Sequence, residues 1–135
     1  MGKLIIKRRS DFCNQLANYQ LLLDGNKIGS VSYGQSKEFN ITPGQHILKA
    51  NFEYSKIYSS PEVLLTFNEN EQKELIVSGF KYSNYIVPVV AICIFFSFLF
   101  PDIKTKLLFY IPFFIMAVYN LTIGRKRYLT FKEIR

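Results

Sequence analysis

His46 is the only histidine in the 135-residue chain, and its side chain is the one best suited to general acid–base catalysis near neutral pH. A catalytic histidine needs a cysteine, serine or aspartate partner, and none stands at a recognisable motif spacing. His46 also follows Pro43 and Gly44, two residues that favour a turn. We therefore expect His46 at the rim of a β domain, without a catalytic role.

Three acidic side chains lie close together near an expected turn: Glu69, Glu71 and Glu74. They could form a weak cation site, but a solvated loop is the favoured interpretation. The glycines between positions 25 and 44 are spread over several expected hairpins. They lack the strand, Gly-rich loop and helix of a phosphate-binding loop, so neither feature predicts a binding site.

The two cysteines, Cys13 and Cys93, are far apart along the chain, and neither has the C-x-x-C spacing of a metal or redox motif. We expect two structural thiols in a reducing compartment. The sequence therefore predicts no catalytic, cofactor-binding or metal site, no cofactor and no small-molecule substrate. It favours a protein that is not an enzyme.

The positive charge is distributed unevenly along the chain. Residues 1–83 have a net charge of +2, whereas residues 84–135, the more apolar part, have a net charge of +5. A nucleic-acid-binding protein would place its basic patch on a folded face, so nucleic acid is not expected as a partner. The basic residues flank two uncharged apolar runs instead.

These apolar runs, at 85–100 and 107–124, predict a transmembrane helical hairpin over residues 83–124, with helices at about 85–101 and 107–124. At ~1.5 Å per residue the runs reach roughly 24 and 27 Å, slightly short of a hydrocarbon core of about 30 Å. Flanking residues can extend them. A re-entrant hairpin and a buried core hairpin are the alternatives.

Basic residues are expected to flank the membrane at both ends of this hairpin. They are Lys81, Lys104, Lys106, Arg125, Lys126 and Arg127. Since lysine and arginine are enriched on the cytoplasmic side, the basic tail predicts that the N- and C-termini are both cytoplasmic. The predicted localisation is the inner (cytoplasmic) membrane, as a multi-pass protein with the lipid bilayer as a partner.

Residues 1–82 predict a small β-sandwich domain, because short runs of alternating apolar residues are separated by turn residues. Apolar residues from Tyr19 to Leu23 share one face, and Asp24 and Gly25 then supply a tight hairpin turn. A longer strand begins near His46, and its apolar side chains as far as Tyr54 share one face.

Two stretches, YQLLLDGNKIG at 19–29 and FNITPGQHILKA at 39–50, resemble the PEGA-type β-sandwich, in which a D-G-x-x-I/V-G hairpin precedes a P-G-x-H strand. The resemblance covers roughly residues 3–80 and extends to small bacterial membrane proteins that join such a domain to C-terminal transmembrane segments. It implies a non-enzymatic accessory or surface-interaction module. The expected fold class is a mostly β N-terminal domain, a small immunoglobulin-like or PEGA-like sandwich, plus two transmembrane α-helices.

The basic C-terminal tail, residues 125–135, contains the segment YLTFKEI at 128–134, which is rich in β-forming residues. Because both termini are expected on one side, we expect this segment to dock on the β domain as an edge strand. A disordered tail is the alternative.

Together these features favour a membrane-anchored interaction module or an accessory subunit of a membrane protein complex, with another protein as its partner. The alternative is a small membrane effector whose helices form a homo-oligomer and perturb the bilayer. Heterologous partners in a mild-detergent extract would support the first interpretation, and a large homo-oligomer would support the second.

Overall fold

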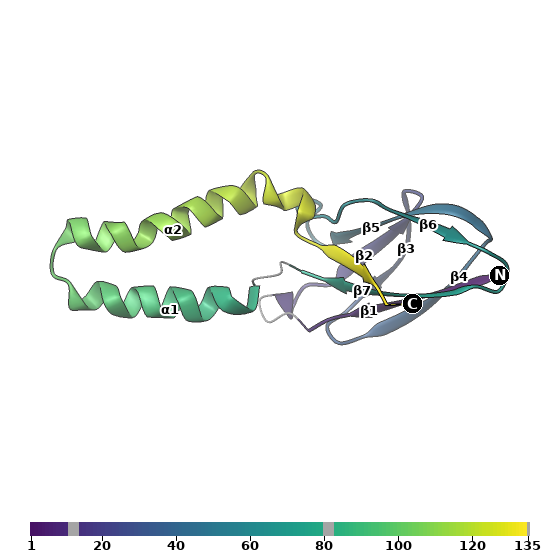
Figure 1. The fold of residues 1–135 in the computed structure, drawn as a ribbon, viewed down its shortest axis with the longest axis horizontal. Helices are drawn as coiled ribbons and strands as arrows, with labels where there is room; N and C mark the ends of the chain where they lie inside the picture. The colour runs from purple at the N-terminus through teal and green to yellow at the C-terminus, as the bar shows by residue number, and fades with distance from the viewer. Residues whose placement is uncertain (11–13, 80–82, 135) are drawn as a thin grey trace.

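The computed structural model describes residues 1–10, 14–79 and 83–134, which form a two-sheet β-sandwich with a helical hairpin at one end (Figure 1). The strands are β1 (Gly2–Arg8), β2 (Tyr19–Leu23), β3 (Asn26–Val31), β4 (Ser36–Ile41), β5 (Gly44–Phe52), β6 (Val63–Phe67), β7 (Gln72–Ser78) and β8 (Thr130–Glu133). Between β7 and β8 the chain forms the helices α1 (Ser83–Leu99), α2 (Ile103–Leu121) and the short 3-10 helix η2 (Gly124–Arg127).

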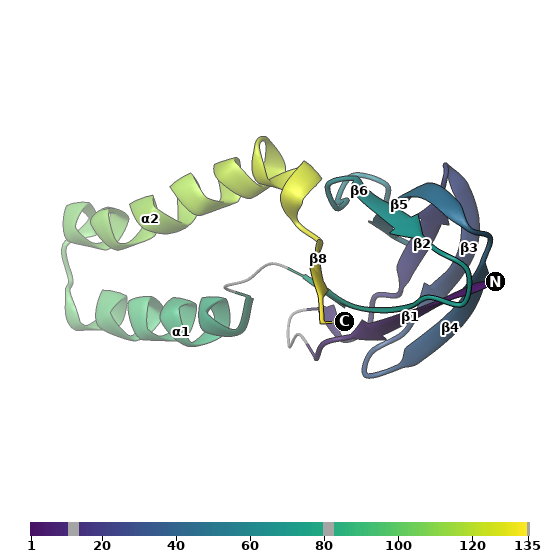
Figure 2. The same cartoon turned by 45° about the vertical axis from the view of Figure 1, so that its right-hand side comes forward.

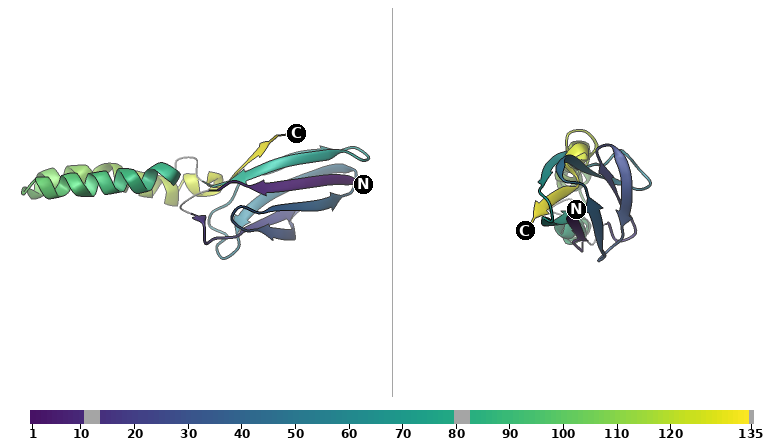
Figure 3. Two further views of the ribbon diagram at one scale, coloured as in Figure 1. Left: turned by 90° about the horizontal axis from the view of Figure 1, so that it is seen from below. Right: turned by 90° about the vertical axis from the view of Figure 1, so that its right-hand side faces the viewer.

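Two four-stranded sheets make up the sandwich within the described residues. The first sheet has the order β4-β1-β7-β8, in which β1 and β7 run parallel and the other pairs are antiparallel. The second sheet has the order β3-β2-β5-β6 and is antiparallel throughout. The end-on view of Figure 3 shows the two sheets as two layers around a shared interior.

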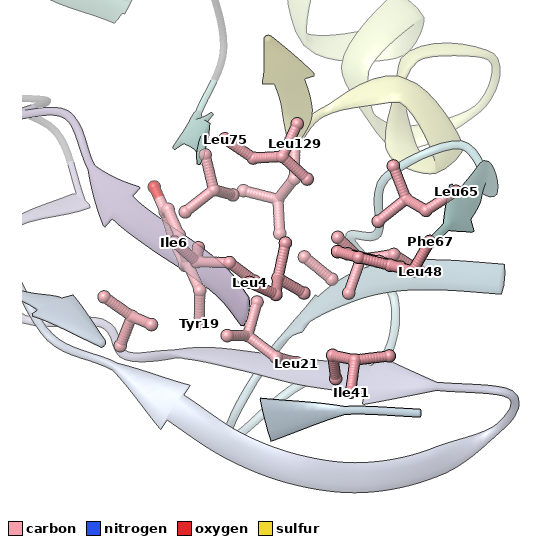
Figure 4. Packing of buried hydrophobic residues seen from close by; sticks show 13 residues of the cluster. Leu4, Ile6, Tyr19, Leu21, Ile41, Leu48, Leu65, Phe67, Leu75 and Leu129 are labelled. Carbon is pink, nitrogen blue, oxygen red and sulfur yellow. The ribbon is translucent and has the colours of Figure 1, made fainter. Parts of the chain in front are cut away.

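The core lies between the sheets because apolar side chains alternate along the strands and point to one face. The alternation predicted for the strands beginning near Tyr19 and His46 is confirmed at Tyr19, Leu21, Leu48 and Ala50, which are fully buried. Figure 4 shows the whole cluster. Its members are Leu4, Ile6, Tyr19, Leu21, Val31, Ile41, Leu48, Ala50, Leu65, Phe67, Leu75, Val77 and Leu129.

The predicted turn at Asp24 and Gly25 is confirmed as a two-residue hairpin loop between β2 and β3. Leu23 pairs with Asn26 across the loop, and the φ angles of Asp24 and Gly25 are 51° and 82°. Two consecutive positive φ angles are typical of a type I′ turn, whose twist matches that of the flanking strands. The turn places the Asp24 carboxylate at one end of the sandwich.

The helical hairpin extends away from the sandwich, and the N-terminus lies at the opposite end of the molecule (Figures 1 and 2). Helix α2 begins where Asp102 acts as its N-cap, with its carboxylate accepting hydrogen bonds from the Thr105 N–H at 3.2 Å and the Thr105 hydroxyl at 3.1 Å. This cap fixes the start of α2 directly after the turn at Pro101.

The predicted transmembrane hairpin is wrong: in the described parts of the chain, no helix is both long and apolar enough to cross a membrane. Helix α1 has 17 residues, about 26 Å at ~1.5 Å per residue. Helix α2 has 19 residues but begins with Lys104 and Lys106 in its first turn. The spans at 85–101 and 107–124 are therefore corrected, as is the multi-pass localisation in the inner (cytoplasmic) membrane with cytoplasmic termini. The observed fold class is a mostly β domain of two sheets plus two helices.

The hairpin is an insertion between two neighbouring strands of one sheet. Strand β8 pairs antiparallel with β7, with Val77 opposite Phe131, and the Ile134 N–H donates to the Glu74 carbonyl at 2.9 Å. The tail thus docks on the domain as an edge strand. We call residues 83–123, between these two strands, the apolar arm.

Candidate functional site

His46 lies at the end of the sandwich that carries the β2–β3 turn, where it contacts Asp24. The Nδ1 atom of His46 lies 2.6 Å from Oδ2 of Asp24, and its Nε2 atom lies 2.9 Å from the Thr42 carbonyl oxygen. The other oxygen of Asp24 accepts the backbone N–H of Ile47 at 2.8 Å. These bonds join the β2–β3 turn to the β4–β5 turn.

The hydrogen bonds of His46 favour its doubly protonated form. An ionised carboxylate and a backbone carbonyl can only accept hydrogen bonds, so both ring nitrogens must donate. The hydroxyl of Thr42 lies 3.4 Å from Nε2 in an arrangement that outwardly resembles a catalytic triad. While His46 is doubly protonated, its imidazole cannot take a proton from that hydroxyl, and the cluster acts as a clamp between the two turns.

The hydrogen-bonded pair of His46 and Asp24 makes the free energy of unfolding of the protein depend on pH. The hydrogen bond to Asp24 raises the pKa of His46, and the same bond, with that from the Ile47 N–H, lowers the pKa of Asp24. Stabilisation from His46 is complete below the ordinary histidine pKa of about 6.5 and is lost as pH rises through its raised pKa. Stabilisation from Asp24 is complete above about pH 4 and is lost as pH falls through its lowered pKa.

We therefore expect the free energy of unfolding of the wild type to decline between about pH 6.5 and the raised folded-state pKa of His46. In an Asp24→Asn variant most of this decline should be absent, because the partner charge of His46 is removed. Asparagine tolerates positive φ, so the turn itself is preserved. Denaturant unfolding of the full chain at a series of pH values measures both curves. Parallel curves for the two proteins would contradict the clamp.

The three glutamates that suggested a weak cation site do not converge. Glu71 accepts the Asn68 N–H at 2.8 Å, which lowers the pKa of its carboxyl group, and it also pairs with Lys73 at 3.3 Å. Glu74 forms an ion pair with Lys7 on the neighbouring strand, and Glu69 is exposed in the turn. Within residues 1–10, 14–79 and 83–134 no group of three or more His, Cys, Asp or Glu side chains could hold a metal ion.

Cys93 belongs to no metal-ligand cluster among the described residues. Cys93 is a free, half-buried thiol on α1 and lines an apolar cavity between the two helices. Cys13 lies outside the described residues, as does the predicted flanking residue Lys81.

The surface most suited to an interaction is the apolar arm, which is exposed on all sides. Helix α1 contains no charged residue, and Phe95, Phe98 and Leu99 are 64%, 80% and 59% exposed. Helix α2 is charged only at Lys104 and Lys106. Its exposed apolar side chains are Ile103, Leu107, Leu108, Tyr110, Ile111, Phe114, Ile115, Val118, Tyr119 and Leu121. A monomer in water rarely exposes so large a continuous apolar surface, which marks an interaction site.

The two helices of the arm contact each other near its tip and separate toward its base. Near the tip the Phe109 ring stacks on Phe96 and Phe100, with centroid distances of 6.5 and 5.8 Å, and the hydroxyls of Ser97 and Tyr110 lie 3.3 Å apart. Closer to the sandwich an almost wholly apolar cavity of about 320 Å³ opens between the helices. The arm therefore leaves apolar surface uncovered inside as well as outside.

The predicted flanking basic residues fall at the two ends of the arm. Lys104 and Lys106 lie at its tip, whereas Arg125, Lys126 and Arg127 form η2 at its base. The backbone N–H of Ser59 donates to the Arg125 carbonyl at 3.0 Å, so η2 is held against the loop after β5. The structure thus brings the η2 residues to the sandwich, away from Lys104 and Lys106.

The sequence patterns predicted neither the pairing of Asp24 with His46 nor the burial of Arg8 in the sandwich. Asp24 is separated from His46 by 22 positions, so no local motif could reveal the pair. Arg8 is only 4% exposed and lies 3.8 Å above the Tyr19 ring. Arg8 lies two residues after Ile6 and four after Leu4, so the alternation of a strand places all three side chains on the same buried face of β1. This alternation is the pattern from which the burial of Arg8 could have been predicted.

Comparison with known proteins gives no relative on which to base a function. No family model matches the chain, and no curated protein matches it either. The resemblance to a PEGA-type domain in a bacterial membrane protein with a C-terminal transmembrane hairpin is therefore corrected, because it rested on turn residues that many β-hairpins share. The chain is a mostly β two-sheet domain that carries an inserted two-helix arm.

Proposed function

We propose that the protein is a non-enzymatic interaction module, an accessory subunit whose apolar arm inserts between apolar helices of a larger protein assembly. The observation that carries this proposal is the exposure of large apolar side chains around the whole arm. A helix that is apolar all round is stable only when it is covered on every side.

The arrangement of the exposed side chains favours several partner helices over self-association. Ile94, Phe95 and Phe96 are consecutive on α1 and are all at least 43% exposed, and consecutive helix positions differ by about 100° in direction. They therefore point to different sides of α1. A two-fold pair of arms would cover one side and leave the others in water, whereas a multi-helix partner can cover them all.

The anchoring of the arm also supports a binding role. Its two ends continue from β7 and into β8, which are paired strands of one sheet. The end of the arm that follows α2 is therefore held in place by η2 and β8 before any partner arrives. Binding with a preorganised element loses less conformational entropy than binding with a flexible one. Aromatic residues on the arm, such as Phe98 and Phe114, are of the type that dominates interface energetics.

The proposal is tested with a photo-crosslinking amino acid in place of Phe98, introduced into the full chain in its native host. After mild-detergent extraction, crosslinked peptides are identified by mass spectrometry, and the mass of the complex is measured. We expect crosslinks to apolar helical segments of one or a few other proteins in fixed stoichiometry. Crosslinks only between copies of this chain, or a single copy surrounded by lipid and detergent alone, would contradict the proposal.

Charge substitutions provide the matched control for this experiment. Phe114→Glu places a carboxylate on a side chain that is 72% exposed on α2, and it should reduce the recovered complex at least tenfold because the charge would be desolvated. Leu16→Glu makes the same change at a residue of the β domain that is 99% exposed, and it should leave the complex intact. Equal loss in both variants would count against a role for the arm.

A further inference from the structure

A cleft of about 560 Å³ opens where the base of the arm meets the sandwich. Four basic side chains from three parts of the chain line it: Lys49 of β5, Lys56 of the following loop, and Arg125 and Lys126 of η2. Among the described residues, Glu62 is the one acidic side chain that lines it. Its volume falls within the range of about 300–1,000 Å³ that is usual for small-molecule sites.

Most of the positive charge in the cleft is not balanced by acidic side chains of the described residues. Glu62 lies 3.9 Å from the Lys49 ammonium group and can offset that one charge. Lys56, Arg125 and Lys126 have no ion-pair partner among the described residues. Like charges around a concave surface repel one another and concentrate a positive potential inside it, which attracts an anion.

The backbone holds these cations together despite their repulsion. The Ser59 N–H donates to the Arg125 carbonyl at 3.0 Å, and the Leu129 N–H donates to the Ser59 carbonyl at 3.3 Å. Arg125 of η2 and Leu129, two residues after η2, are thereby both tied to the loop that carries Lys56. Because Leu129 is fully buried, the connection cannot swing away without opening the core. The cluster is thus a fixed feature of the fold.

We propose that this cleft is a binding site for a small anion that carries phosphate groups. The Arg125 guanidinium presents paired donors that match the oxygens of a phosphate, and the lysine ammonium groups supply further charge-assisted hydrogen bonds. Three uncompensated cations suit a ligand with a charge of about −2 to −4, which a pyrophosphate group has at neutral pH. The site is separate from the apolar arm surface and involves different residues.

The test is calorimetric titration of the full chain with inorganic pyrophosphate at constant ionic strength. The Arg125→Gln/Lys126→Gln double variant removes two cleft charges and should bind at least about tenfold more weakly, because charge-assisted bonds are lost. The matched control, Lys104→Gln/Lys106→Gln, removes two charges at the far tip of the arm and should bind like the wild type. Higher salt should weaken wild-type binding.

A second titration, with glycerol 3-phosphate, distinguishes the source of the phosphate. Tighter binding of pyrophosphate supports a free phosphate compound, and tighter binding of glycerol 3-phosphate supports a phospholipid headgroup; either is consistent with a phosphate site. The proposal is overturned if wild-type protein binds neither compound, or if both double variants lose binding equally. Far-UV circular dichroism of each variant confirms that the fold is intact before binding is compared.

Discussion

Replacing Leu129 with alanine is expected to lower the free energy of unfolding of the full chain by about 2–5 kcal/mol, the usual range for truncating a buried leucine. Leu129 is fully buried although it belongs to the C-terminal tail, and Figure 4 shows it in one cluster with Leu75 and Leu4. The change would leave a cavity between the docked tail and the sandwich. Urea unfolding followed by circular dichroism measures the effect.

Two further variants make this result specific. Leu64→Ala makes the same truncation on β6, where the side chain is 63% exposed, and should change stability by less than about 0.5 kcal/mol. Leu129→Met keeps most of the buried volume and should cost less than about 1.5 kcal/mol, so it remains measurable if the alanine variant does not fold. Equal stability of the Leu129→Ala and Leu64→Ala variants would refute the docking of the tail.

Deletion of residues 128–135 is expected to destabilise the β domain more than the Leu129→Ala substitution does. It removes Leu129, uncovers the β7 edge that β8 occupies, and takes the Tyr128 ring away from Tyr58, at 4.9 Å, and Phe52, at 5.6 Å. We expect the β domain of the shortened chain to melt at a lower temperature than that of the Leu129→Ala variant. An unchanged melting temperature would show that the sandwich does not use the tail.

The second large effect is expected at Arg8. Its guanidinium donates to the backbone carbonyls of Asn14, Ala17 and Val31, and it stacks on Tyr19 at 3.8 Å. Arg8→Met keeps the apolar stem but removes every donor, which leaves buried carbonyl groups without these hydrogen bonds. We expect a loss of about 3 kcal/mol in the free energy of unfolding.

The neighbouring arginine is a natural control for this prediction. Arg9 is exposed, and its contact with the sheet is a backbone bond from its N–H to the Val77 carbonyl at 3.0 Å. Arg9→Met should therefore change stability by less than about 0.5 kcal/mol. Arg8→Lys keeps the charge but loses the fork of donors, so its stability should lie between wild type and Arg8→Met. Equal effects at both positions would show that charge, and not buried hydrogen bonding, is the cause.

These predictions reflect how the arm is connected to the rest of the molecule. The arm leaves the sandwich from β7 and returns through η2, which is hydrogen-bonded to the loop after β5 at Ser59, and then through Leu129 in the core and β8 on the sheet. Loosening of the tail would therefore release one anchor of the arm and would displace Arg125 from the cleft. The apolar arm and the basic cleft both depend on the same few contacts at the base of α2.

Local sequence patterns predicted much of the β domain because they act over only a few residues. Alternation fixed which side chains of β2 and β5 face inward, and Asp24-Gly25 specified a turn with positive φ. The β-forming residues of the tail predicted a strand near the end of the chain, and β8 occurs there. Each of these features follows from a residue and its immediate neighbours.

The two apolar runs predicted helices correctly, but they did not predict the exact ends of those helices. They predicted two helices, and α1 and α2 are present, but the predicted membrane spans depended on where each helix begins and ends. The Asp102 cap starts α2 at Ile103, so that two lysines fall inside the helix, and α1 ends at Leu99 after 17 residues. Hydropathy alone does not predict the residues at which these helices begin and end.

The sequence by itself determined the strand faces, the hairpin turn, the apolar character of the arm and the absence of a local catalytic motif. Only the tertiary structure decided which distant residues meet. It placed Asp24 against His46, buried Arg8 over Tyr19, paired β1 with β7 in parallel, and brought Arg125 and Lys126 to Lys49 and Lys56. The physical reason is that these contacts join segments far apart in the chain, so they form only when the two sheets close around one core.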